Sequence, residues 1–180
     1  ATNMYAVCGA TPSYFTKGSS ILSCGAEYTY NDGTSDYVTS GNTPLIDDLI
    51  LEHNPTLVFV TFASNMFGSS ETTIESTAES FAEEITSSSA SCYWIGSPQG
   101  PRYNDLEAYQ QYKETIKAGA ENGGCTFIDS EEYTSFAFCD DDSFGCDADP
   151  HFDNHGAEGK TAAQEWALGV YADFLALVED

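Results

Sequence analysis

Two of the chain's three histidines, His151 and His155, lie in one short segment, Cys146–Gly156, and each follows an aspartate by two residues. The carboxylates are Asp149 before His151 and Asp153 before His155. A carboxylate beside an imidazole fixes its tautomer and stabilises its charged form, which a general base in nucleophilic catalysis requires. The segment is a candidate active-site block, although Asp, Asn, Gly and Pro are also common in surface loops.

The rest of the chain alternates apolar strands with helices. Apolar runs predict buried strands at 4–8, 57–62, 92–95 and 125–128. Stripes at helical spacing predict helices between Asn42 and Asn54 and at 72–87, 105–120 and about 157–178. In the last helix the stripe predicts six buried side chains: Ala163, Trp166, Ala167, Val170, Phe174 and Leu177. Residues 23–40 fit either one strand and a loop or a hairpin about Asn31-Asp-Gly33.

Buried strands separated by helices are typical of a three-layer α/β/α sandwich around a parallel sheet. With 180 residues and 41% hydrophobic content, we expect a single domain, residues 1–180. Ligands of such sheets bind beyond the carboxyl ends of the strands, so the segments after each strand should form one cleft. These segments are 9–13, 40–42, 63–65, 96–98 and the Asp/His segment.

That set resembles the SGNH hydrolase superfamily, also called GDSL esterases, in which four short blocks supply a serine, a glycine, an asparagine and a histidine. Gly9-Ala-Thr-Pro-Ser13 looks like the Gly-Asp-Ser block, Ser40-Gly41 like the glycine block and Ala63-Ser-Asn65 like Gly-x-Asn. Asp149-Pro-His151, followed by the Trp166 helix, is similar to the final Asp-x-x-His block. The resemblance covers nearly the whole chain by element order, and it implies a flavodoxin-like parallel sheet of about five strands.

The first block departs from the family pattern at the nucleophile. Strict alignment puts Thr11 at the serine position and Ala10 at the aspartate, with Ser13 two residues late. We favour Ser13, because the threonine hydroxyl is hindered by its methyl group and a helix start offers free backbone N–H groups. The alternative is that Thr11 only caps the helix and Pro12 fills its first position.

The last block departs from the pattern as well, because neither Ala148 nor Phe152 supplies the aspartate three residues before a histidine. We favour His151 with Asp149, since this leaves room for a turn at 156–159 into the last helix. Asp147 is the alternative orienting carboxylate, and His155 with Asp153 is the alternative pair. His53, at a helix end, is expected to be a surface or boundary residue.

The resemblance implies a secreted serine esterase that hydrolyses short acyl esters, acetyl esters above all, on carbohydrate or peptidoglycan. Ser13 would attack the carbonyl, His151 would carry the proton and Asp149 would orient the imidazole. Backbone N–H groups of Ser13 and Gly41 and the amide of Asn65 would hold the oxyanion. The lost Gly-Asp-Ser motif also allows an inactive relative that binds a glycan or a protein.

Charge limits the partners. The chain has 29 acidic and 5 basic residues, a net charge of −24, which disfavours binding to nucleic acid and to anionic membranes. Arg102, the only arginine, is the candidate contact for an anionic substrate group. We expect a monomer that needs no cofactor.

Six cysteines indicate an oxidising compartment, secreted or periplasmic. We expect the disulfides Cys8–Cys24, Cys92–Cys125 and Cys139–Cys146, and the Ala-Thr-Asn start resembles a mature N-terminus left by signal-peptide removal. Zinc is disfavoured, because neither Cys-x-x-Cys nor His-x-x-x-His occurs. Calcium remains an alternative, with oxygen ligands at Asp140, Asp141, Asp142, Asp147 and Asp149, against an acidic solvated loop.

Overall fold

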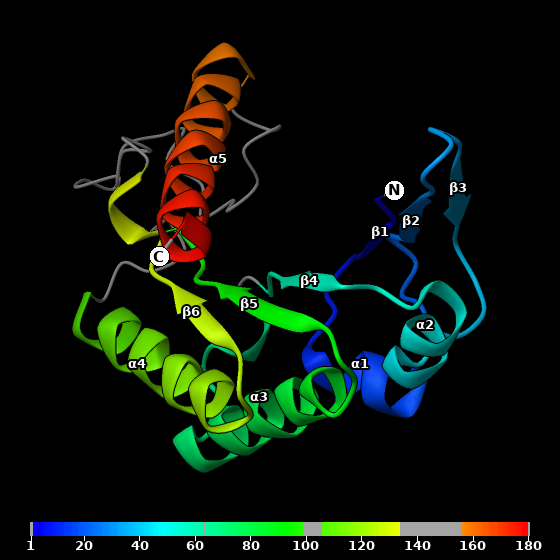
Figure 1. The fold of residues 1–180 in the computed structure, drawn as a ribbon, viewed down its shortest axis with the longest axis horizontal. Helices are drawn as coiled ribbons and strands as arrows, with labels where there is room; N and C mark the ends of the chain where they lie inside the picture. The colour runs from blue at the N-terminus through cyan, green and yellow to red at the C-terminus, as the bar shows by residue number, and fades with distance from the viewer. Residues whose placement is uncertain (1, 63, 99–105, 134–155, 180) are drawn as a thin grey trace.

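The computed structural model describes residues 2–62, 64–98, 106–133 and 156–179, and in this part of the chain the strands form two sheets. The antiparallel sheet has the order β1-β2-β3, with β1 at Met4–Val7, β2 at Ala26–Thr29 and β3 at Ser35–Val38. The parallel sheet has the order β4-β5-β6, with β4 at Leu57–Val60, β5 at Ser91–Ile95 and β6 at Thr126–Ile128. Figure 1 shows the two sheets lying apart.

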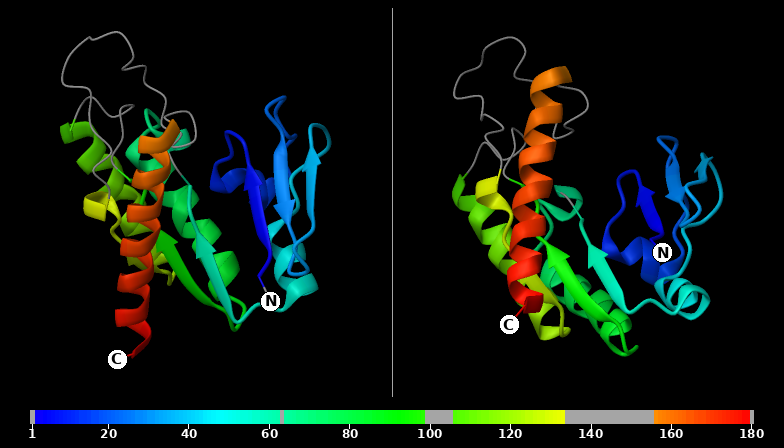
Figure 2. Two further views of the ribbon diagram at one scale, coloured as in Figure 1. Left: turned by 90° about the horizontal axis from the view of Figure 1, so that it is seen from above. Right: turned by 45° about the horizontal axis from the view of Figure 1, so that its top comes forward.

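Helices cover both faces of the parallel sheet, which gives the expected three layers (Figures 1 and 2). Helices α3 (Glu71–Thr86) and α4 (Leu106–Asn122) lie on one face and α5 (Gly156–Glu179) lies on the other. Successive strand residues point to opposite faces. Accordingly, Cys92 and Trp94 of β5 join the core under α3 and α4, whereas Tyr93 and Ile95 pack with Val170 of α5.

The prediction of about five parallel strands is wrong, because the parallel sheet in the described residues has three. Segment 4–8 forms β1, which pairs antiparallel with β2 and exposes Met4 and Ala6, so it is not a buried parallel strand. The Cys8–Cys24 disulfide and a 3.0 Å hydrogen bond from Cys8 N–H to the Gly25 carbonyl hold the two strands together.

Of the two predictions for residues 23–40, the hairpin is confirmed. Tyr30 N–H donates to the Thr34 carbonyl at 2.9 Å, and Gly33 adopts a φ of +82°. The Asp32 carboxylate accepts from both the backbone N–H and the hydroxyl of Thr34, which lowers the pKa of Asp32. An Asn-Asp-Gly turn supplies both the side-chain acceptor and the left-handed position that a tight reversal needs.

The predicted helices form, with small shifts at their ends. Helix α1 spans Pro12–Lys17, and α2 spans Ile46–His53 and ends at Asn54, where φ is +42°. Short 3₁₀ turns, η1 and η2, occupy Ser64–Met66 and Glu131–Tyr133. All five residues of the stripe in α3 are buried, as its spacing predicts: Ile74, Ala78, Phe81, Ala82 and Ile85.

Two burial predictions fail at the outer layer of the sandwich. In α5, Val170 is buried and Trp166 is partly buried, but Ala167 and Leu177 are exposed. Strand β4, predicted to be covered on both faces, is an edge strand of the described sheet. Its Phe59 remains 47% exposed, although its ring packs with those of Tyr93 and Phe174. One helix on this face covers the parallel sheet incompletely.

Two of the three expected disulfides are present. Cys92 and Cys125 are joined at the starts of the adjacent parallel strands β5 and β6, with Cα atoms 4.6 Å apart, and Cys8 is joined to Cys24. Cys139 and Cys146 lie outside the described residues. No helix in the part of the chain that the structure describes is long and apolar enough to cross a membrane.

Candidate active site

The turn between β1 and α1 carries both candidate nucleophiles. Gly9, at a φ of +68°, begins the turn, and Ala10 N–H donates to the Val7 carbonyl at 3.2 Å. Thr11 then occupies the N-cap position of α1, and Pro12 lies in its first turn. Proline suits that place because its missing N–H would have no partner there. The local sequence therefore explains the turn without any reference to catalysis.

The hydroxyl groups of Thr11 and Ser13 form a hydrogen bond with each other, with 2.8 Å between the two oxygens. Both residues are partly buried, and the Thr11 side chain makes no capping bond to the backbone of α1. Thr11 is thus a cap by position, but its hydroxyl bonds to the Ser13 side chain and not to the helix backbone. A serine hydroxyl is a weak nucleophile until a neighbouring base takes its proton.

Asn65 brings the third sequence block to the first. It lies in η1, directly after β4, and its Nδ2 donates to the carbonyl of Ala10 at 2.9 Å. An amide nitrogen carries two protons, so this bond uses one of them and the second N–H can donate to an oxyanion. Ser13, Thr11 and Asn65 accordingly lie on two adjoining segments.

Gly41 lies in a segment that is bonded to the chain following α1. Its carbonyl accepts from Ile21 N–H at 2.9 Å, and Ser20 and Asn42 form an isolated antiparallel bridge. Gly41 has a φ of +106°, and a Cβ added there would meet no atom within 4 Å. The conformation, rather than close packing, accounts for glycine at this position.

Buried Thr43 connects this segment to α1. Its hydroxyl lies 2.5 Å from the carbonyl oxygen of Tyr14 and 3.2 Å from that of Ser19. Thr43 is 3% exposed, and its own N–H also donates to the Ser19 carbonyl at 2.9 Å, so backbone and side chain together tie this segment to the end of α1. Sequence reasoning missed this residue, because a threonine before a proline reads as an ordinary loop residue.

The expected base block lies outside the described residues: His151 and Asp149, the alternatives Asp147, His155 and Asp153, and the rim candidate Arg102. The described part therefore holds the candidate nucleophiles and the two candidate oxyanion residues Gly41 and Asn65. Within it, no group of three or more His, Cys, Asp or Glu side chains could hold a metal ion.

The one histidine in the described ranges, His53, lies where α2 meets β1. Its Nε2 is 2.5 Å from the hydroxyl oxygen of Tyr5, and the two rings stack with centroids 5.9 Å apart. Partial burial, followed by the negative charge of Glu52, raises the pKa of the Tyr5 phenol. His53 is therefore a half-buried packing residue at a boundary between elements.

A second polar cluster, unexpected from the sequence, lies at the carboxyl end of β6. The Lys113 ammonium group contacts Asp129 at 2.8 Å and Glu131 at 2.5 Å, and Gln110 donates to Glu131 at 2.6 Å. Burial would lower the pKa of Lys113, but the hydrogen bonds and charges of the two carboxylates outweigh it and raise that pKa. The sequence feature that could have predicted this cluster is the spacing of Lys113, which follows the buried Tyr109 by four residues and so lies on the buried face of α4.

A small cavity lies between the parallel sheet and α4, next to that cluster. Its lining includes Phe62, Trp94 and Phe127 from the sheet side and Tyr112 and Lys113 from α4. Trp94 is fully buried, and its indole N–H finds no hydrogen-bond partner among the described residues. The Tyr109 hydroxyl donates to the carbonyl of Ser97 at 2.8 Å, which fixes the chain after β5 at the mouth of the cavity.

Comparison of the chain with models of protein families, with curated proteins and with solved structures finds no match.

Proposed function

We propose that the chain is a secreted serine esterase of the SGNH type that hydrolyses short acyl esters, with acetyl groups on carbohydrate or peptidoglycan as the substrate class. The observation that carries the proposal is the bond from Asn65 Nδ2 to the Ala10 carbonyl, 2.9 Å long. It joins the segment after β4 to the turn that carries Ser13. An SGNH-type site requires that the serine block and the asparagine block lie next to each other.

In the proposed reaction, Ser13 Oγ attacks the ester carbonyl and His151 takes its proton, with Asp149 orienting the imidazole. The second Nδ2 proton of Asn65 and the backbone N–H groups of Ser13 and Gly41 stabilise the oxyanion. The proton then passes from His151 to the leaving alcohol, and water hydrolyses the acyl-enzyme by the same route. Arg102 is proposed as a contact for a polar or anionic group of the substrate.

The hydroxyl pair refines the choice of nucleophile. Thr11 and Ser13 share one hydrogen bond, so the two hydroxyl groups have different roles: one is acylated and the other keeps it in place. Serine is the less hindered of the two, and we assign attack to Ser13 and orientation to Thr11. Oxidising surroundings, indicated by the disulfides Cys8–Cys24 and Cys92–Cys125, support a secreted protein.

The test combines turnover with covalent labelling. Hydrolysis of p-nitrophenyl acetate should fall at least about 10³-fold in Ser13→Ala and His151→Ala, and less in Thr11→Ala. A fluorophosphonate should label the wild type once, and peptide mass analysis should find the label on Ser13. Ser89→Ala, at an exposed serine after α3 and outside the candidate site, is the matched control and should retain full activity.

Three results would contradict the proposal in different ways. A label on Thr11 would exchange the roles of the two hydroxyl groups. Full activity of Ser13→Ala together with His151→Ala would place the chemistry elsewhere, and equal loss in the matching His155→Ala variant would point to the alternative pair. Absence of labelling and of turnover on acetylated glycans would favour the inactive binding module.

A further inference from the structure

Helix α5 carries two apolar stripes, and among the described residues only one of them packs against the other elements. Along the inner stripe, Val170 is buried and Phe174 packs its ring against Phe59 and Tyr93, with centroids 5.0 and 5.1 Å apart. The flank beside Gly169 is also covered, since a Cβ at this glycine would lie 2.3 Å from Tyr133. These contacts account for the sheet side of the helix.

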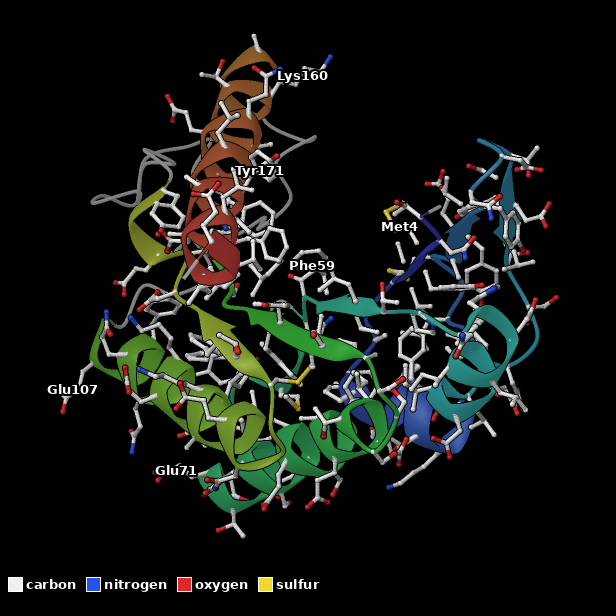
Figure 3. The ribbon with its side chains drawn as sticks, viewed as in Figure 1. Met4, Phe59, Glu71, Glu107, Lys160 and Tyr171 are labelled. Atoms are coloured by element: carbon white, nitrogen blue, oxygen red, sulfur yellow. A yellow bond between two sulfur atoms is a disulfide. The ribbon has the colours of Figure 1, made fainter. Side chains whose placement is uncertain are left out.

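The second stripe consists of Leu168, Tyr171, Leu175 and Val178, which we call the outer stripe. Leu168 is 68% exposed, Tyr171 57% and Val178 49%, and Leu175 is partly exposed. At 3.6 residues per turn, this stripe is centred about 120° around the helix from the inner stripe. Figure 3 shows the side chain of Tyr171 on α5, well away from α3 and α4.

The spacing of the outer stripe is that of a helix-pairing seam. Its members follow each other at intervals of three, four and three residues, the a/d pattern by which two helices pack side by side. Three exposed apolar side chains and a fourth that is partly exposed, all on one helix face, exceed the scattered apolar residues of an ordinary surface. The pattern predicts another helix as the occupant.

The charged residues at the two ends of α5 favour a second copy of α5 as the partner helix, packed antiparallel. Lys160, near the amino end of α5, is the only basic residue of the helix, and Glu179 ends it. Each charge opposes the dipole of its own helix, because cations are favoured at the carboxyl end and anions at the amino end. In an antiparallel pair, each charge would lie beside the favourable end of the neighbouring helix.

We propose that α5 pairs antiparallel with α5 of a second copy of this chain and forms a homodimer. One register pairs the two central residues of the outer stripe together with the two terminal charges: when Leu168 faces Tyr171 of the second copy, Lys160 faces Glu179. In this register Leu175 and Val178 face Gln164 and Thr161, which are exposed and uncharged. This proposal replaces the monomer expected from the sequence and is independent of the esterase chemistry.

The dimer is expected to be weak. One helix pair, about 36 Å long for the 24 residues of α5, buries less than a standard interface. Two copies of charge −24 also repel each other. We therefore expect micromolar rather than nanomolar affinity, so that the monomer and the dimer exchange within an accessible concentration range.

Sedimentation velocity of the full chain from 1 to about 200 µM tests the proposal. The wild type should dimerise, and Leu168→Glu or Tyr171→Glu should raise the dissociation constant at least tenfold, because each change acts twice in a symmetric interface. Leu51→Glu is the matched control: Leu51 is 82% exposed on α2 and lies outside α5, so this variant should dimerise like the wild type.

A charge swap tests the register. Lys160→Glu and Glu179→Lys should each weaken the dimer several-fold, and the double variant should restore it, since the opposite charges again face each other. Circular dichroism would show that each variant remains folded. A wild type that stays monomeric up to about 200 µM, or a dimer indifferent to Leu168→Glu, overturns the proposal; a double variant weaker than both single variants overturns the antiparallel register.

Discussion

Thr43 shows how a single buried hydroxyl group can shape the candidate site. It supplies one proton to two carbonyl oxygens, those of Tyr14 and Ser19, and so holds the segment that contains Gly41 against the end of α1. Valine has almost the same shape but no donor. Thr43→Val would therefore remove the hydroxyl bond, while the Tyr14 carbonyl keeps the N–H of Ser19 and the Ser19 carbonyl keeps the N–H of residue 43.

We expect Thr43→Val to lower the free energy of unfolding by about 0.5–1.5 kcal/mol, the net contribution of a hydrogen bond, because each carbonyl group keeps a backbone N–H partner. Urea denaturation followed by tryptophan fluorescence measures the change. Thr39→Val, at an exposed position, should change stability by less than about 0.5 kcal/mol. Equal values for the two variants would show that the Thr43 hydroxyl contributes no net stability.

At the scale of elements, helix α4 packs against α3 through small residues. A Cβ at Gly119 would lie 2.4 Å from the carbonyl oxygen of Glu75 and 2.9 Å from Ala78 Cβ, and one at Gly123 would lie 2.5 Å from Ala82 Cβ. These glycines let the two helix backbones approach each other closely. The approach is completed by the Thr86 hydroxyl of α3, which donates to the Gly123 carbonyl at 2.7 Å.

Gly119→Ala should destabilise the protein, although alanine is the better helix former by about 1 kcal/mol. The added methyl group meets backbone atoms of α3, which cannot rotate away, so the two helices must separate. We expect a net loss of about 1–3 kcal/mol in urea denaturation. The neighbouring variant Ala118→Gly measures the effect of helix propensity without the packing effect, and it should lower the free energy of unfolding by about 1 kcal/mol. A more stable Gly119→Ala would contradict the close packing.

The elements themselves were largely predictable from local pattern. The stripe of α3 and the parallel pairing that brings Cys92 beside Cys125 follow from periodicity and from element order. The partner of β1 did not follow, because a short apolar run fits either a parallel or an antiparallel neighbour. The pairing of β1 with β2 is fixed by the disulfide from Cys8 to Cys24 and by the hydrogen bond from Cys8 to Gly25, which join residues distant in the sequence.

Among the polar contacts, too, some were predictable from the sequence and others were not. The meeting of Asn65 with the turn after β1 was expected from the common edge of the strands, although β1 joins a different sheet. The Lys113 cluster was not expected, since a single lysine in a helix normally reaches solvent. Its partners Asp129 and Glu131 come from the chain after β6, and only the fold brings them within reach.

At the scale of the whole molecule, self-repulsion is the dominant electrostatic feature. The chain carries 29 acidic and 5 basic residues, and one of its few cations, Lys113, is already paired with Asp129 and Glu131. Five basic side chains cannot neutralise 29 acidic ones. A large net charge of one sign opposes the compact state, and dissolved ions screen that opposition over about 10 Å at 0.1 M.

Added salt should therefore stabilise this protein. We expect its Tm to rise by several degrees between 10 mM and 0.5 M NaCl at pH 7, because screening weakens repulsion more in the folded chain than in the expanded one. Choline chloride at equal ionic strength is the control for specific sodium binding and should raise the Tm equally. Millimolar CaCl₂ at constant ionic strength tests the acidic segment, since only a bound calcium ion would raise the Tm further and lose that gain on chelation. A Tm that is flat or falls with NaCl would mean that the acidic side chains are already balanced by contacts in the fold, and that the net charge does not limit stability.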